Sequence, residues 1–163
     1  TAPARRLAGL ILAAAAAACS PQSPATSTTS SASAFEQDGQ ARLRQVPLTI
    51  RSAGGTHRFT VEVARAAKEQ EIGLMFRHGL APDAGMIFPY PTERPVAFWM
   101  KNTYISLDLI FIRADGRIAR IAENSVPRSL DLIHSGEPVA TVLEIAGGRS
   151  AELGLRPGDL VAW

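Results

Sequence analysis

The segment that most constrains the fold is residues 107–112, Leu-Asp-Leu-Ile-Phe-Ile, in which every side chain except Asp108 is apolar. A short run that is apolar on both of its faces predicts a strand covered on both sides in the interior of a sheet. The chain must therefore supply neighbouring strands and two layers of cover. Asp108 is the exception, and strand parity places it on the same face as Ile110 and Ile112.

Several other runs can supply the neighbours. Residues 46–51 and 58–64 alternate apolar and polar side chains around a Gly-Gly pair, and a tight turn after the central strand leads into 117–122, so two hairpins are predicted. This pattern is typical of a mainly β fold, an antiparallel jelly-roll-like sandwich or a partly open barrel with one short helix. The remaining predicted elements are strands at 138–145 and 160–163, a helix at 66–73 and a long, partly ordered loop at 77–95.

The opening segment predicts export. Arg5 and Arg6 precede twelve apolar or Gly residues, a length that fits a secretory signal and is too short to span a bilayer, which needs roughly 20 residues. Ala residues just before Cys19 resemble the cleavage site of bacterial lipoproteins, whose Cys is lipidated. We therefore expect a signal at 1–19 and a membrane anchor at Cys19, the alternative being ordinary cleavage and a soluble periplasmic protein.

The next segment, residues 20–45, is predicted to be a disordered tether. Nine of the fifteen residues from Ser20 to Ala34 are Ser or Thr, and such a composition cannot bury enough apolar surface to offset the entropy of ordering. A tether is useful when one of its ends is fixed, which favours lipidation. A single β-rich domain is then expected at 46–163.

Charge excludes one class of partner. Lys and Arg number 17 and Asp and Glu 15, and two of the basic residues lie in the opening segment, so 15 basic residues balance 15 acidic ones downstream. Nucleic-acid-binding domains carry a basic excess, and we expect no nucleic-acid partner. Because Cys19 is the only Cys, no intramolecular disulfide can form. No motif indicates a cofactor.

Five motifs resemble the family known as domain of unknown function 192. The resemblance covers most of 46–163 and implies one β-rich, jelly-roll-like domain, often exported, with no established activity or catalytic residues. The motifs are Gly73-Leu74-Met75-Phe76-Arg77, Gly85-Met86-Ile87-Phe88, Phe98-Trp99-Met100-Lys101-Asn102-Thr103, Leu107-Asp108-Leu109-Ile110-Phe111-Ile112 and Val142-Leu143-Glu144-Ile145-Ala146-Gly147-Gly148.

Two acidic residues interrupt otherwise apolar strand faces. Asp108 and Glu144 need a cation or several hydrogen-bond donors if they are buried, and Arg77, Lys101 and Asn102 are the candidate partners. One interpretation is a ligand pocket or an acid–base site in which burial shifts a carboxyl pKa. The other is a salt-bridged plug that pins the 77–95 loop to the sheet.

The leading hypothesis is a non-catalytic, envelope-anchored binding module. Its cleft is predicted to contain the 77–95 loop and a polar cluster of Arg77, Trp99, Lys101, Asn102, Asp108 and Glu144. The alternative is a hydrolase acting on an envelope polymer with Asp108 and Glu144 as its carboxylate pair. A third hypothesis is a purely structural envelope protein, with the polar cluster fully buried and no pocket.

Metal binding is the weaker interpretation of the sulfur and imidazole side chains. Three Met within 26 residues could bind Cu(I), but Met also fills irregular cores, and His57, His78 and His134 are scattered. We therefore expect no metal site.

Overall fold

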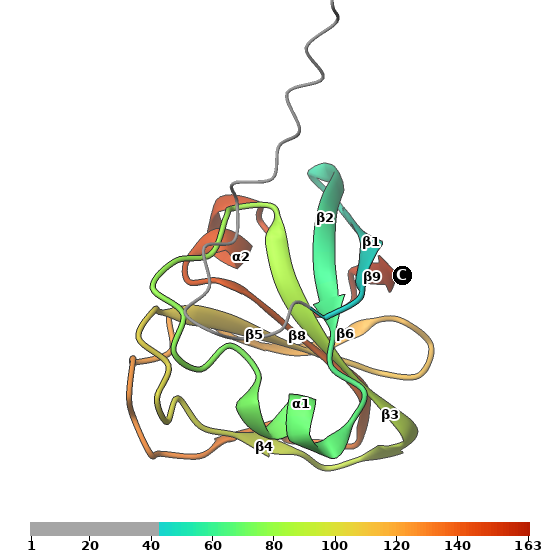
Figure 1. Cartoon of the computed structure of the whole chain (residues 1–163). Helices are drawn as coiled ribbons and strands as arrows, with labels where there is room; N and C mark the ends of the chain where they lie inside the picture. Colours follow the sequence, from blue (N-terminus) through green and yellow to red (C-terminus); the bar gives the residue numbers. More distant parts are fainter. Residues whose placement is uncertain (1–42) are drawn as a thin grey trace, which may run out of the picture. The chain divides into compact units, whose positions relative to one another are not determined.

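The computed structural model describes residues 43–163 (Figure 1). The predicted signal, Cys19 and most of the tether lie outside the described residues. The first strand begins at Gln45, one residue before the predicted domain boundary, and Arg44 already accepts a hydrogen bond from the backbone of Val63. The elements are β1 Gln45–Ser52, β2 Gly55–Val63, α1 Ala67–Ile72, β3 Ala84–Arg94, β4 Ala97–Phe98, β5 Leu107–Ile112, β6 Ile118–Ala122, β7 Ile133–His134, β8 Val139–Ala146, α2 Arg149–Glu152 and β9 Leu160–Ala162.

Seven of these strands form one curled sheet in the order β6-β5-β8-β3-β2-β1-β9. Strand β5 lies between β6 and β8, which confirms the predicted interior strand. An isolated bridge between Arg117 and Leu160 brings the β6 end of the sheet to the β9 end, and the Ile118 amide donates to the Asp159 carbonyl at 2.9 Å. The mainly β, partly open barrel is therefore confirmed. Its pairs are antiparallel except for β2 and β3, which are parallel.

The prediction of a long loop at 77–95 is wrong over most of its length, because residues 84–94 form β3 in the middle of the sheet. Glycine at position 85 is required by close packing, because a Cβ there would lie 2.5 Å from the Glu144 carbonyl oxygen. Pairing with β8 becomes irregular only after Pro89, where a strand can tolerate proline. The predicted helix at 66–73 is confirmed as α1.

The sheet has a hydrophobic core on each face. Ile110, Leu143 and Ile145 point into the curl of the sheet and pack against residues of β1, β2 and β9. On the other face, Met86 and Phe111 belong to a second core that includes Phe88, Met100, Leu107 and Leu109. Segments outside the main sheet cover this second face. In Figure 1, α1 and β4 lie beneath it.

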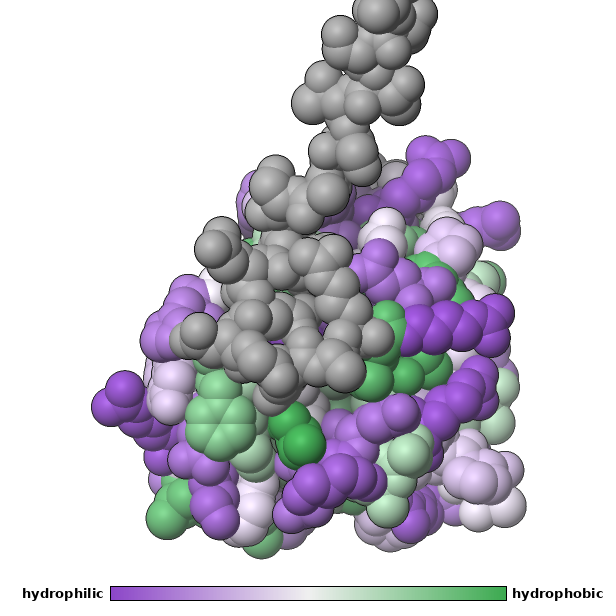
Figure 2. Space-filling view, in the orientation of Figure 1, coloured by the Kyte–Doolittle hydropathy of each residue, from purple (hydrophilic) through white to green (hydrophobic). Residues whose placement is uncertain are grey.

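The surface of the described residues carries scattered apolar side chains. Figure 2 shows hydrophobic residues in small patches among hydrophilic ones on the visible face. Val126, Leu130 and Leu132 are the most exposed large aliphatic residues. Among residues 43–163, no helix has the length and apolar character needed to cross a bilayer.

Candidate functional site

Asp108 and Glu144 point to opposite faces of the sheet. Asp108 is paired with Ile145 and faces the inner core, whereas Glu144 is paired with Leu109 and Met86 and faces the outer core. Two carboxyl groups separated by a sheet cannot flank one scissile bond. The predicted carboxylate pair is therefore excluded as the catalytic pair of a glycosidase.

Asp108 is a structural anchor. Its Oδ1 accepts hydrogen bonds from the amides of Asn124 and Gly148 at 2.8 and 2.9 Å, and its Oδ2 accepts one from Ser150 at 2.8 Å. The side chain is completely buried and needs no cation, because three amides satisfy it. It fixes the turn that leads from β8 into α2.

Arg77 forms an ion pair with Glu62, a residue that the sequence pattern did not single out. Its two terminal nitrogens donate to Oε1 and Oε2 of Glu62 on β2, at 2.8 and 2.9 Å, and the two side chains are 3 % and 0 % exposed. On β2, Glu62 lies on the face opposite Phe59, Val61 and Val63. In the sequence, a charged residue at such a position is typical of a side chain that faces solvent. The plug interpretation expected the 77–95 loop to be pinned to the sheet through Asp108 or Glu144. Arg77 forms a buried ion pair of that kind, which holds residues 74–82 against β2, but its acid is Glu62.

Glu144 is the buried acid left without such a pair. Its side chain is 95 % buried, and no described residue forms a hydrogen bond with its carboxyl group that would stabilise the ionised form. Burial raises the pKa of Glu144 to about 8, although the charge of Arg77 opposes this shift. A carboxylic acid that titrates near neutral pH can donate a proton, accept one or bind a cation.

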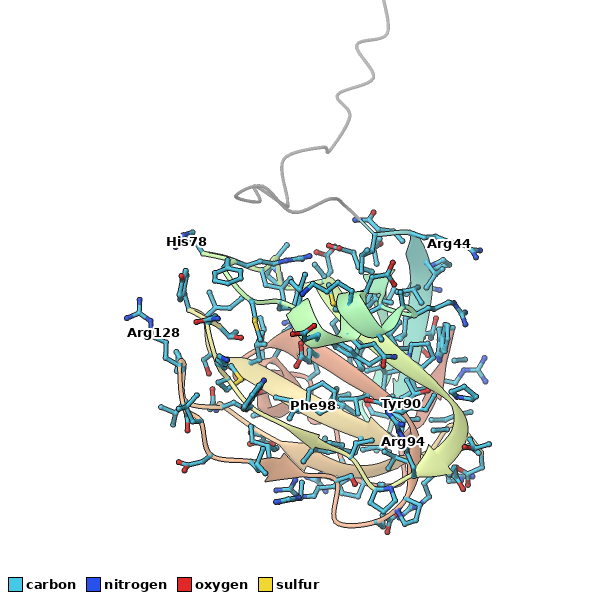
Figure 3. The ribbon with its side chains drawn as sticks, turned by 60° about the horizontal axis from the view of Figure 1, so that its bottom comes forward. Arg44, His78, Tyr90, Arg94, Phe98 and Arg128 are labelled. Carbon is cyan, nitrogen blue, oxygen red and sulfur yellow. The ribbon has the colours of Figure 1, made fainter. Side chains whose placement is uncertain are left out.

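Glu144 lines a pocket of about 310 Å³ between α1, β3 and the β4 segment. The floor is apolar, and Phe98 packs edge-to-face on Phe88 with ring centroids 5.2 Å apart. Figure 3 shows Tyr90 and Phe98 close together beneath α1, with Arg94 beside Tyr90. The aromatic residues that line the pocket are Phe88, Tyr90, Phe98 and Trp99, and the acidic ones are Glu71 and Glu144. None of the thirteen lining residues is basic.

Of the other predicted site residues, Trp99 lines this pocket, and Lys101 and Asn102 follow it in the chain without belonging to the lining. Trp99 lines it and is 45 % exposed, and the Lys101 ammonium lies 5.1 Å from the centre of its ring. Lys101 is exposed, so its prediction as the buried partner of an acid is wrong. Asn102 adopts a left-handed backbone (φ 56°) and its carbonyl accepts a hydrogen bond from Phe76, which joins the two loops. Only Trp99 and Glu144 of the predicted cluster line the pocket; Arg77 acts on Glu144 through its charge.

Comparison with known proteins identifies the family. The model of the family DUF192, described as Uncharacterized ACR, matches residues 48–163, which is more than half of the chain. The chain belongs to the DUF192 family. None of the curated proteins compared with the chain matches it.

Two solved structures resemble the DUF192 chain. One, from Sinorhizobium meliloti 1021 and named as a candidate transcription regulator, is 46% identical with a TM-score of 0.73, over 76% of this chain and 97% of that one. The other, a protein of unknown function from Novosphingobium aromaticivorans DSM 12444, is 42% identical with a TM-score of 0.74, over 81% of this chain and 94% of that one.

The sulfur and imidazole groups of the DUF192 domain are dispersed. Met86 and Met100 are buried in the outer core, and Met75 lines the pocket. His57 forms a 3.1 Å hydrogen bond with Ser52, His78 packs against Tyr104, and His134 lies on β7. Within residues 43–163 no three His, Cys, Asp or Glu side chains are grouped as metal ligands.

Proposed function

We propose that this DUF192 protein is a non-catalytic binding module and that its ligand site is the pocket between α1, β3 and the β4 segment. The observation that carries the proposal is a buried carboxyl group in the wall of an open pocket that is also lined by four aromatic side chains. Ligand sites are concave, largely apolar and equipped with a few polar groups that orient the ligand. The pocket combines Phe88, Phe98 and Trp99 with Glu144 in this way.

Binding is favoured over catalysis by the groups that the pocket offers. Among residues 43–163, its lining contains no Ser, Cys, His or Lys, and its two hydroxyl groups belong to Tyr90 and to Thr103, whose Oγ1 donates to the Lys101 carbonyl rather than to a base. Nucleophilic catalysis needs a nucleophile next to a base. The second predicted acid, Asp108, lies on the other face of the sheet with its lone pairs used by backbone amides.

A pocket-filling variant tests the proposal. Ala97 is exposed and lines the pocket, so Ala97→Phe should occlude it without disturbing the core. Ala114→Phe, in the exposed turn after β5, is the matched control. A library of neutral, cationic and anionic fragments would be screened by ligand-observed NMR. We expect some fragments to bind the wild type and Ala114→Phe but not Ala97→Phe. A library with no such hit would refute the proposal.

We further propose that the domain works in the cell envelope, held by a lipid on Cys19. The support is the sequence pattern: a signal-like segment at 1–19, a small-residue cleavage site and a Ser/Thr-rich tether that gives a fixed domain some reach. Mass spectrometry of the intact protein from membrane fractions should find an acylated Cys19, and Cys19→Ser should release the protein from the membrane. An unacylated protein in the soluble periplasmic fraction would contradict lipidation.

A further inference from the structure

The ionisable residues that line the pocket include two acids and no base. Glu62 engages both terminal nitrogens of Arg77, so most of the charge of this cation is matched by its own partner. Glu144 therefore remains a buried acid without an equal counter-charge. Glu71 adds a second acid on the α1 side, where it forms an exposed ion pair with Lys68 at 3.2 Å, and no basic residue belongs to the lining of the pocket. A ligand that brings a positive charge would complete this arrangement.

The aromatic lining has the matching chemistry. The faces of aromatic rings attract cations that lie within about 6 Å of the ring centre. Two rings of the lining already attract cations of the protein: Arg94 lies 4.5 Å from the centre of the Tyr90 ring, and Lys101 lies 5.1 Å from that of Trp99. Neither of these cations belongs to the lining, so the interior of the pocket stays aromatic and acidic.

We propose that the pocket recognises a small organic cation, an alkylammonium or quaternary ammonium group, with its charge against Glu144 and its carbon atoms among Phe88, Phe98 and Trp99. This inference rests on the proposed function, because it names the ligand class of the same site. The volume of about 310 Å³ restricts the ligand to a small one, since ligand pockets span roughly 300–1,000 Å³.

The protonation of Glu144 provides a test. In the empty pocket its pKa is about 8 because of burial, so the acid is mainly neutral at pH 7. Cation binding needs the ionised form, so the affinity for a permanent cation should rise with pH up to the pKa and stay constant above it. A ligand that accepts a hydrogen bond from the protonated acid should show the opposite trend. The other charged or titratable groups around the pocket are Arg77 with Glu62, Tyr90 with Arg94, Glu71 with Lys68, and Lys101 over the Trp99 ring.

The experiment compares choline with its uncharged carbon isostere 3,3-dimethylbutan-1-ol, and butylammonium with butan-1-ol, by calorimetry on the full chain at about pH 6.5 and about pH 8.5. We expect each cation to bind about tenfold or more tightly than its neutral partner, as a desolvated cation–π and carboxylate site should. Choline should bind more tightly at the higher pH. Glu144→Gln should weaken choline about tenfold and remove the pH dependence, whereas the control Glu123→Gln, at an exposed site outside the pocket, should change neither.

The outcomes separate the ligand class from the function. Trp99→Leu, at a half-exposed site, should also weaken the cations, which keeps the test decisive if Glu144→Gln does not fold. Neutral isosteres that bind as well as the cations and are lost in Ala97→Phe would overturn the cation inference and leave the binding module intact. The inference would also be overturned by cation binding that Glu144→Gln, Trp99→Leu and Ala97→Phe all leave unchanged. If no fragment of any charge occupies the pocket, both proposals fail.

Discussion

The buried pair of Glu62 and Arg77 gives the sharpest stability prediction. Arg77→Met removes the cation that donates to both carboxylate oxygens of Glu62, and it does so at a site where the Glu62 side chain has 0 % exposure. Breaking a buried ion pair from one side costs about 3–5 kcal/mol. For a domain of this size that corresponds to a melting temperature lower by ~12–20 °C.

The assay is urea and thermal unfolding followed by circular dichroism, with two comparisons. The first is Lys68→Met, which removes the exposed ion pair between Lys68 and Glu71 (3.2 Å), and it should change the free energy of unfolding by at most about 1 kcal/mol. The second is the double variant Glu62→Leu/Arg77→Met, which should recover most of the loss, because apolar side chains can replace a buried pair. An Arg77→Met protein within about 1 kcal/mol of the wild type would refute the argument that the pair pins residues 74–82 to the sheet.

Three further predictions follow from the other polar residues. Asp108→Asn should lower the free energy of unfolding by about 2–3 kcal/mol, because its amide nitrogen cannot accept one of the three buried N–H groups; unchanged urea unfolding would contradict the anchor role. Lys101→Ala should cost no more than about 1 kcal/mol, since the residue is exposed and its ammonium lies over the half-exposed Trp99 ring. A drop in melting temperature like that of Arg77→Met would contradict this assignment. The raised pKa of Glu144 means that the folded protein holds a proton that the unfolded chain releases at lower pH, so this group's contribution to stability should fall as pH rises from about 4.5 to about 8 and stay constant above it. Glu144→Gln should therefore gain stability relative to the wild type as pH rises over this range, as measured by the difference in their free energies of unfolding. A difference that does not change with pH would contradict the raised pKa of Glu144.

Local sequence patterns determined much of the fold. Residues 107–112 are apolar on both faces and form the interior strand β5, and the alternating runs on either side of Gly54 and Gly55 form the hairpin of β1 and β2. These features depend on side-chain parity over a few residues, which is visible in the sequence. Parity also placed Asp108 and Glu144 on otherwise apolar strand faces, and both are buried.

Tertiary structure decided what those acids do. Nothing in the spacing of the sequence shows that β5 and β8 pair with Asp108 opposite Ile145, and that register sends the two carboxyl groups to opposite faces of the sheet. The partners of Asp108 are backbone amides, which every residue possesses and which no sequence pattern can identify. Glu62 resembled a solvent-facing residue because burial of both faces of β2 depends on distant segments. Sequence alone thus singled out Asp108 and Glu144, whereas long-range pairing made Asp108 an anchor, placed Glu144 at the pocket and buried Glu62 in an ion pair that no local pattern indicates.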